Sequence, residues 1–217
     1  MSPNSRSRPP AGRGRMPAAQ RRGLIEQVAT ELFAEHGYRG TSMEDIAKRS
    51  GVSVPVVYDH FPSKQQLHEH LLERHFAELR QLWRTQLGRK RPLEQRIATT
   101  LDAWFGYVEA HPYAWRLLFR DTTGDSAVHA MHHAAAEASK EAILPQLFTV
   151  LPAEMSEPGH DEQIEMVWEI VRSALQGLAL WWHENQHVSR DQIVATAMNV
   201  LWIGFERFGA GTYWPAE

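Results

Sequence analysis

The sequence predicts an all-α fold of about nine helices, in which an N-terminal three-helix helix-turn-helix domain precedes a larger helical domain. Apolar residues recur at helical spacing along most of the 217 residues, and no segment alternates apolar and polar residues like a half-buried strand. Proline and glycine gather at a few points, which divide the second part into helices at about 64–87, 92–110, 112–120, 125–149, 161–186 and 190–208. We expect three parts: 1–16, 17–64 and 65–217.

Composition excludes several protein classes. The chain has no cysteine, so a disulfide framework and a thiolate metal site are excluded, and a reducing cytoplasm is favoured. No apolar run reaches about 18 residues, and no apolar stretch follows the arginines at the N-terminus, so we expect neither a membrane span nor a secretion signal.

Residues 1–16 are predicted to be a disordered basic tail. They contain Ser, Pro, Gly and four arginines, but no acidic residue and almost nothing apolar. Two interpretations stay open: a solvated tail, or an arm that lies against phosphates or enters a minor groove.

Three helices follow the tail. The first carries Ile25, Val28, Ala29, Leu32 and Phe33 on one face and ends at His36 and Gly37. Thr41 and Glu44 have capping-box spacing and begin a second helix, which Gly51 ends.

Ser53 is expected to cap a third helix of about seven residues, with Pro55 in its first turn and Val57 and Phe61 facing inward. Such a short helix needs its neighbours to be stable. A second capping-box pattern, Ser63 to Gln66, then opens the long helix at 64–87.

These residues resemble the DNA-binding domain of the TetR family of transcriptional regulators. The resemblance covers roughly residues 20 to 70 and rests on Ala29–Tyr38, Thr41-Ser42, Asp45-Ile46-Ala47, Gly51-Val52-Ser53 and Tyr58–Lys64. The rest resembles the family loosely, most clearly in His111–Asp121. The resemblance implies a ligand-responsive regulator, most simply a repressor, which binds a palindromic operator as a homodimer and is released by a small hydrophobic or aromatic effector. A TetR-like activator without an effector is the alternative within the family.

By resemblance, phosphate contacts are expected from Thr41, Tyr58, His60 and Lys64, and Ser42 is assigned to the same DNA-binding surface. Ser53, Val54, Pro55 and Val56 should face base edges. Since Val54-Pro55-Val56 replaces the more polar residues usual in the family, thymine methyl contacts or DNA shape must carry more of the specificity.

Charge is uneven along the chain and supports that assignment. Up to Lys64 there are ten Lys and Arg against six Asp and Glu, and the remainder carries 23 − 10 = 13 against 26 − 6 = 20. A basic end joined to an acidic domain is typical of a phosphate-binding module joined to another domain.

Eight tryptophans lie beyond the helix-turn-helix, and ordinary core packing explains many of them. Some could line a cavity for an aromatic or hydrophobic ligand, and the family places such a pocket among the middle helices. We predict a lining of Trp83, Trp104, Val108, Trp115, Phe119, Met131 and Trp168. Arg116, Arg120 and His132 are candidate polar contacts.

The last two long helices carry apolar faces too wide for a lone hairpin to cover, which predicts a four-helix bundle between two subunits. The corresponding helices form the homodimer in the family. The predicted interface is Val171, Leu175, Leu178, Trp182, Ala197, Leu201, Gly204 and Phe208.

Two histidine patterns suggest an alternative of a different class, a zinc-dependent hydrolase. His183-Glu184-x-x-His187 is a literal HExxH, although the Gly of its extended form is replaced by Arg190. His129, His132 and His133 share a helix face and could bind a metal or be hydrated. We predict no metal and no cofactor, because the HExxH pattern falls at the expected end of a helix, just before Ser189, which is expected to cap the next one. No catalytic residue is predicted, since there is no cysteine nucleophile, no Gly-x-Ser-x-Gly elbow and no phosphate-binding glycine loop.

Overall fold

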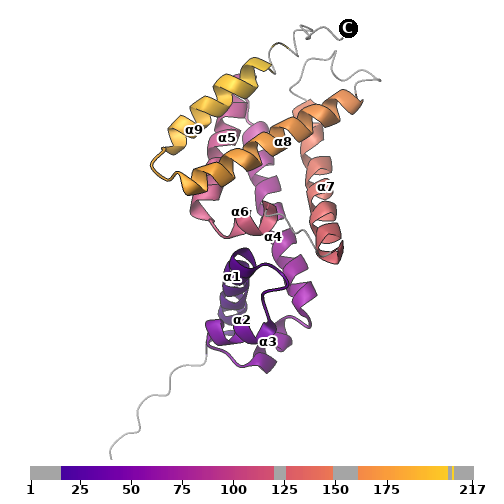
Figure 1. Ribbon diagram of the computed structural model, residues 1–217. Helices are drawn as coiled ribbons and strands as arrows, with labels where there is room; N and C mark the ends of the chain where they lie inside the picture. The colour runs from indigo at the N-terminus through magenta and orange to yellow at the C-terminus, as the bar shows by residue number, and fades with distance from the viewer. Residues whose placement is uncertain (1–15, 120–125, 149–160, 205–206, 208–217) are drawn as a thin grey trace, which may run out of the picture.

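The computed structural model describes residues 16–119, 126–148, 161–204 and 207, and within them it consists of helices joined by short turns, with no strand (Figure 1). The all-α class is therefore confirmed. The described residues form nine α-helices: α1 (Ala18–His36), α2 (Met43–Ser50), α3 (Val54–His60), α4 (Lys64–Leu87), α5 (Leu93–Ala110), α6 (Ala114–Phe119), α7 (Ser126–Phe148), α8 (Asp161–Glu184) and α9 (Arg190–Ala197).

Helices α1, α2 and α3 form a small N-terminal bundle, which we call the head. Its centre is made of side chains that are completely buried: Ile25, Ile46, Val57 and, from the first turn of α4, Leu67. Each comes from a different helix, so neither of the two short helices, α2 and α3, has a core of its own, as their length predicts.

Helix α4 runs from the head into the larger domain (Figure 1). It packs against α1 at its beginning and against α5, α6 and α7 farther along. One hydrophobic cluster extends from Ile25 through Leu71 and Phe76 to Ala197. The division at Lys64 stays a prediction, and α4 is the element that both parts share.

The predicted helices of the larger domain agree with α5 to α8 within about two residues at each end. The last helix differs, because α9 ends at Ala197 and a π-helical turn, Met198–Trp202, follows it before the α-helix resumes. The predicted end at residue 208 lies outside the described residues.

The cap of α2 corrects the predicted Thr41–Glu44 box by one position. Ser42 accepts a bond from the backbone N–H of Asp45 at 3.1 Å, and the Asp45 carboxylate accepts from the Ser42 backbone N–H at 3.2 Å. Both halves of the capping box are thus present one residue later than expected. Ser53 precedes α3 but makes no side-chain cap bond, whereas Ser63 accepts from the Gln66 N–H as predicted.

Within the described part of the chain, no helix is both long enough and apolar enough to cross a bilayer.

Candidate nucleic-acid interface and cavity

The turn between α2 and α3 has the geometry that a helix-turn-helix requires. Gly51 lies in the left-handed region with φ 65°, where a side chain would be strained. The Val52 N–H donates to the Ala47 carbonyl at 3.0 Å, which closes the end of α2. The chain therefore reverses within three residues, as the sequence predicted.

Helix α3 is held by one side and presents the other to solvent. Val57 is its only buried residue, and Phe61 after its end is also buried. Pro55 and Tyr58 are exposed, the latter at 45%, and Val54 and Val56 are half-buried. Since its outward side chains do not serve the core, α3 is available for an external partner.

Two of the predicted phosphate contacts are used inside the head. Thr41 is only 2% exposed, and its hydroxyl lies 2.9 Å from the Gly37 carbonyl and 3.1 Å from that of Leu32. This burial is incompatible with the predicted contact of the Thr41 side chain with phosphate. The Lys64 ammonium donates to the Tyr38 carbonyl at 2.9 Å and the Thr41 carbonyl at 3.0 Å. It also lies 4.3 Å from the centre of the Tyr38 ring, so at most one ammonium proton remains for DNA.

Within residues 16–64, positive and negative charges are balanced. The segment has six Lys and Arg (Arg21, Arg22, Arg39, Lys48, Arg49, Lys64) and six Asp and Glu. Arg49 is paired with Glu31 at 2.9 Å and with Glu35 at 2.8 Å. The basic excess found in the sequence therefore comes entirely from the four arginines of residues 1–15, which lie outside the described residues.

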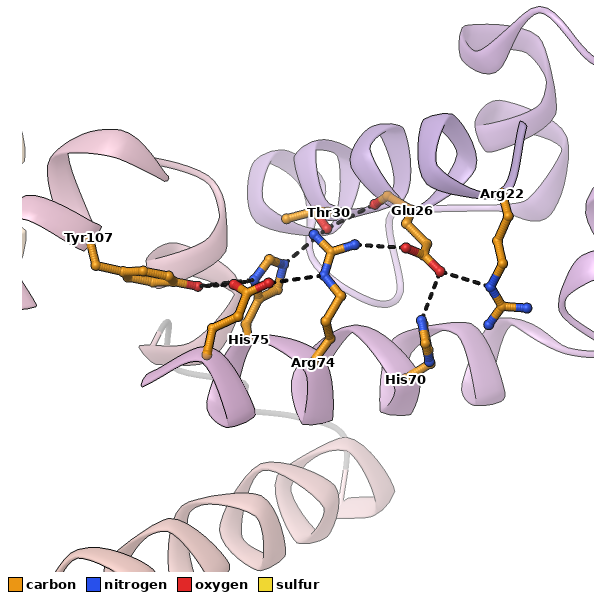
Figure 2. Close-up of polar contacts among 8 residues, drawn as sticks. Arg22, Glu26, Thr30, His70, Arg74, His75 and Tyr107 are labelled. Carbon is orange, nitrogen blue, oxygen red and sulfur yellow. Dashed lines mark hydrogen bonds and ion pairs between the residues drawn. The ribbon is translucent and has the colours of Figure 1, made fainter. Parts of the chain in front are cut away.

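A buried carboxylate fastens α1 to α4 (Figure 2). The Glu26 side chain is 11% exposed and accepts from Arg22 at 3.0 Å, from His70 at 2.8 Å and from Arg74 at 2.7 Å. Burial alone would raise the pKa of Glu26, but the hydrogen bond and charge of His70, followed by those of Arg74, hold it below the usual 4.5. Arg22 also lies 4.4 Å over the Phe61 ring, so the same cluster contacts the end of α3.

The polar chain continues along α4 to α5 (Figure 2). The Tyr107 hydroxyl donates to the Glu78 carboxylate at 3.1 Å and lies 3.0 Å from His75 Nδ1. His75 is buried, and burial lowers its pKa. Side chains of α1, α4 and α5 are therefore joined in one network, which sequence reasoning missed because its members are far apart in the chain.

A cavity of about 500 Å³ lies within the larger domain, between α4, α5, α6, α7 and α8. Four of the seven predicted lining residues do line it: Trp83, Trp104, Phe119 and Trp168. The other three, Val108, Trp115 and Met131, do not: Val108 and Trp115 are buried in the core and Met131 packs against it. Arg116 does not line it either, and Arg120 lies outside the described residues.

Histidines from α7 form one wall of the cavity, and only His132 was predicted to contact a ligand. His132 Nδ1 lies 3.3 Å from the Leu118 carbonyl, and its ring centre lies 5.5 Å from that of His68 on α4. Burial lowers the pKa of His132, and it lowers that of His68 to about 3. Burial thus disfavours the charged form of both imidazoles.

Seven of the eight predicted dimer residues lie on α8, on α9 or in the helical turns that follow α9, and several of them face the core of this chain. Leu175, Trp182 and Ala197 are each 4% exposed, so the structure places them in the protomer core. Six of the eight most exposed large apolar side chains in the described residues instead lie elsewhere on these helices: Met166, Ile170, Leu180, Trp181, Val200 and Ile203. Val171, Leu178 and Leu201 are half-buried, Gly204 is exposed, and Phe208 lies outside the described residues.

The zinc interpretation finds no support in the local geometry. Helix α8 ends at Glu184, so His183 and His187 are not one turn apart on a helix, as two zinc ligands of that motif require. The His183 ring instead lies 5.7 Å from the Trp115 ring. In the described part of the chain, no cluster of three His, Asp or Glu side chains could hold a metal ion.

Comparison with known proteins places both parts of the chain in one group. Residues 25–71 match the family model described as bacterial regulatory proteins, tetR family, and residues 93–204 match the tetracyclin repressor-like C-terminal domain. The HTH-type transcriptional activator FasR of Mycolicibacterium smegmatis is 30% identical over 191 residues, which cover 88% of this chain and 85% of that protein.

Solved structures share the fold. A TetR-like transcriptional regulator from Rhodococcus sp. RHA1 gives a TM-score of 0.70 at 18% identity and covers 88% of this chain and 99% of that one. A tetR-family transcriptional regulator from Streptomyces coelicolor gives 0.61 at 25% identity, covering 90% and 87%. FadR from Bacillus subtilis, in complex with stearoyl-CoA, gives 0.66 at 16% identity, covering 84% and 97%.

Proposed function

Because the chain belongs to the TetR family of bacterial regulatory proteins, we propose that this transcriptional regulator binds a two-fold symmetric DNA operator as a homodimer and responds to a small apolar ligand. The observation that carries the DNA-binding part is the presentation of α3, which buries only Val57 and turns Pro55 and Tyr58 to solvent. A helix presented in this way can enter the major groove.

Different residues of the head and the start of α4 are proposed to contact the bases and the phosphates of DNA. Ser53, Val54, Pro55 and Val56, at its beginning, are proposed to face base edges. Tyr58, His60 and Ser42 are proposed to contact phosphates, together with the remaining proton of Lys64. Thr41 contributes only by holding the turn before α2. Since the head has balanced charge, the tail arginines are proposed to supply much of the attraction to phosphates.

The ligand is proposed to occupy the cavity and to act through α4. This helix lines the cavity with Phe76, Leu79 and Trp83, and its first half is fastened to α1 through His70 and Arg74. A ligand that displaces α4 therefore moves the head, and the two α3 helices of a dimer then lose their spacing. The effect requires different affinities for the two spacings, with a coupling of about 1–3 kcal/mol per site. FadR, the structural neighbour, binds stearoyl-CoA, which supports a long apolar ligand here.

The homodimer is proposed to form through the exposed apolar side of α8 and the end of the described chain. Met166, Ile170, Gly177 and Trp181 fall at intervals of four, seven and four residues, so they form one stripe on α8. An exposed stripe of this kind is costly in water, and a second copy would bury it. Two-fold pairing also gives two α3 helices to read the two halves of a palindrome.

The sign of regulation depends on where the operator lies relative to the promoter. The resemblance suggested repression, whereas the relative FasR is named an activator, which favours activation. Repression and activation both require the protein to reach the DNA of the bacterial cell, so we propose a cytoplasmic location. The hydrolase alternative is not favoured by any observation in the described structure.

Substitution Pro55→Glu tests DNA binding directly. It places a carboxylate on the exposed side of α3 without touching the core, so DNA affinity should fall by at least about 30-fold, because like charges at an interface cost several kcal/mol. The control is Gln81→Glu, an exposed position on the far half of α4, and it should bind like wild type. Equal binding by Pro55→Glu, measured by fluorescence anisotropy with a duplex selected for binding, would contradict the proposal.

Substitution Ile170→Asp tests the dimer. Ile170 is 63% exposed, so the protomer should stay folded while sedimentation shifts from dimer to monomer. Gln81→Glu again serves as the matched surface control. A wild-type monomer, or an Ile170→Asp protein that remains a dimer, would exclude the proposed interface.

A further inference from the structure

Three side chains form a closed triangle of polar atoms between α4 and α5 (Figure 2). The Tyr107 hydroxyl of α5 lies 3.1 Å from Glu78 Oε2 and 3.0 Å from His75 Nδ1. The two α4 atoms lie 3.1 Å from each other. Arg96 also joins α5 to α4, but it donates to the Leu87 carbonyl at the end of α4. The triangle therefore holds the middle of α4 against α5.

His75 connects this triangle to the head. Its Nε2 lies 3.5 Å from the hydroxyl of Thr30 on α1, and that hydroxyl donates to the Glu26 carbonyl at 2.9 Å. The imidazole is 3% exposed, so water does not readily replace a contact that it loses. A single buried side chain of α4 thus makes polar contacts with both α1 and α5.

The contacts of His75 can be made in two ways. With a single ring proton, which burial favours, His75 donates either to Glu78 through Nδ1 or to Thr30 through Nε2. In the first arrangement, Tyr107 and His75 both donate to the Glu78 carboxylate. In the second, Nδ1 is an acceptor and takes the Tyr107 proton. The joint therefore has two discrete states, which is what a transmitting element requires.

The cavity borders the same part of both helices. Phe76 and Leu79 line the cavity, and each follows one of the α4 members of the triangle by one residue. On α5, Trp104 lines the cavity about one turn before Tyr107. A molecule that displaces these cavity side chains therefore also displaces the Tyr107 hydroxyl relative to α4.

We propose that this triangle is the joint through which the cavity and the head influence each other, with Tyr107 and His75 as positioning residues. When Tyr107 moves away, Nδ1 loses its donor, so the ring proton stays on Nδ1 with Glu78 and the donation to Thr30 is lost. The contact of α4 with α1 then weakens. The inference rests on the proposed function, because it names the residues that carry the response proposed there, but it does not depend on the identity of the ligand.

The test is hydrogen–deuterium exchange of the full chain with and without a duplex selected for binding. Coupling between two sites is reciprocal, so DNA at the head must be felt at α5. In wild type, the duplex should protect amides of α2 and α3 and change the exchange rate of α5 amides near Trp104 by at least about 5-fold. Tyr107→Phe keeps the ring and removes the hydroxyl. It should keep the protection of the head and reduce the α5 change to less than about 2-fold.

Two further variants and a control locate the effect. His75→Phe keeps a buried ring without its nitrogens and should lose the α5 change as Tyr107→Phe does. The double variant should lose no more than either single one, because residues that act through one joint are not additive. The control, Thr85→Val, removes an exposed hydroxyl bonded within α4 and should respond like wild type. Each response is a difference within one variant, so a general loss of stability does not produce it.

The possible outcomes separate this inference from the proposed function. Helix α6 also packs against α1 and offers a different route. An α5 change retained in Tyr107→Phe would overturn the inference and leave the proposed function intact. Protection of α2 and α3 in wild type without any α5 change would also overturn the inference and leave DNA binding intact. If the duplex protects no part of the head, DNA binding through α3 fails, and the inference fails with it.

Discussion

Substitution Glu26→Gln tests how the head is fastened to α4. Glu26 Oε1 accepts from both Arg22 and His70, and Oε2 accepts from Arg74 alone at 2.7 Å. A glutamine can keep its oxygen toward Arg22 and His70, but its amide nitrogen then faces the Arg74 guanidinium, donor against donor. The hydrogen bond from Arg74 is lost, and the bonds from Arg22 and His70 are then made to a neutral acceptor instead of a carboxylate.

The magnitude follows from burial. A hydrogen bond to a charged group contributes about 1.5–3 kcal/mol, and removing one member of a buried pair costs about 3–5 kcal/mol. The three partners, Arg22, His70 and Arg74, are 42%, 37% and 38% exposed, so water screens them and the estimate must be reduced. We expect Glu26→Gln to lower the free energy of unfolding by about 2 kcal/mol in urea titrations followed by far-UV circular dichroism.

The pH dependence gives a second signature. The folded-state pKa of Glu26 lies below its unfolded value of 4.5, so its contribution is complete above that value and is lost as the pH falls through the folded pKa. The difference between wild type and Glu26→Gln should shrink as the pH falls below about 4. The control is Glu69→Gln, an exposed carboxylate on α4 bonded only to Gln65 in the described contacts, which should change stability by less than about 0.5 kcal/mol. A Glu26→Gln protein as stable as this control, or a difference independent of pH, would refute the reasoning.

Three further predictions concern the head. Ser42→Ala should lower the free energy of unfolding by about 1 kcal/mol, whereas Glu44→Gln should be nearly neutral; the reverse order would restore the Thr41–Glu44 cap. Lys64→Ala should lower the melting temperature, because the carbonyls of Tyr38 and Thr41 lose their donor. The same substitution should weaken binding to operator and to unrelated duplexes by the same factor. A loss of affinity confined to the operator would show that Lys64 reads sequence. Deleting residues 1–15 should flatten the dependence of DNA affinity on salt by up to about 0.9 per arginine removed, and an unchanged slope would show that the tail does not contact DNA.

The elements of the fold were largely predictable because local signals mark them. Gly51, Ser63 and the Gly88–Pro92 segment fix helix ends through backbone conformation and capping, and these signals act within a few residues. The N-cap of α2 could not be predicted from neighbouring residues alone. Thr41…Glu44 and Ser42…Asp45 have the same spacing. The Thr41 hydroxyl donates to the carbonyls of Leu32, on α1, and of Gly37, just after α1, so Ser42 is left to cap α2.

The site was predictable only in part, because it depends on which face of a helix meets which neighbour. Helix α8 is apolar on two sides, and its sequence does not say that Leu175 and Trp182 face the core while Ile170 and Trp181 face solvent. Similarly, the tryptophans at 83, 104 and 168 line the cavity, whereas Trp115 is buried beside His183. The Glu26 network joins residues 44 and 48 positions apart, a separation at which a single sequence carries no signal.

The most direct test of the central claim, that α3 is presented to read DNA as one half of a pair, is selection of bound duplexes from a random pool at low salt. The account predicts a two-fold symmetric consensus whose half-sites lie about one helical turn apart, or a multiple of it. It also predicts that the Pro55→Glu protein enriches no sequence from the same pool. Enrichment of nothing by wild type, or of a single site without symmetry, would contradict the account.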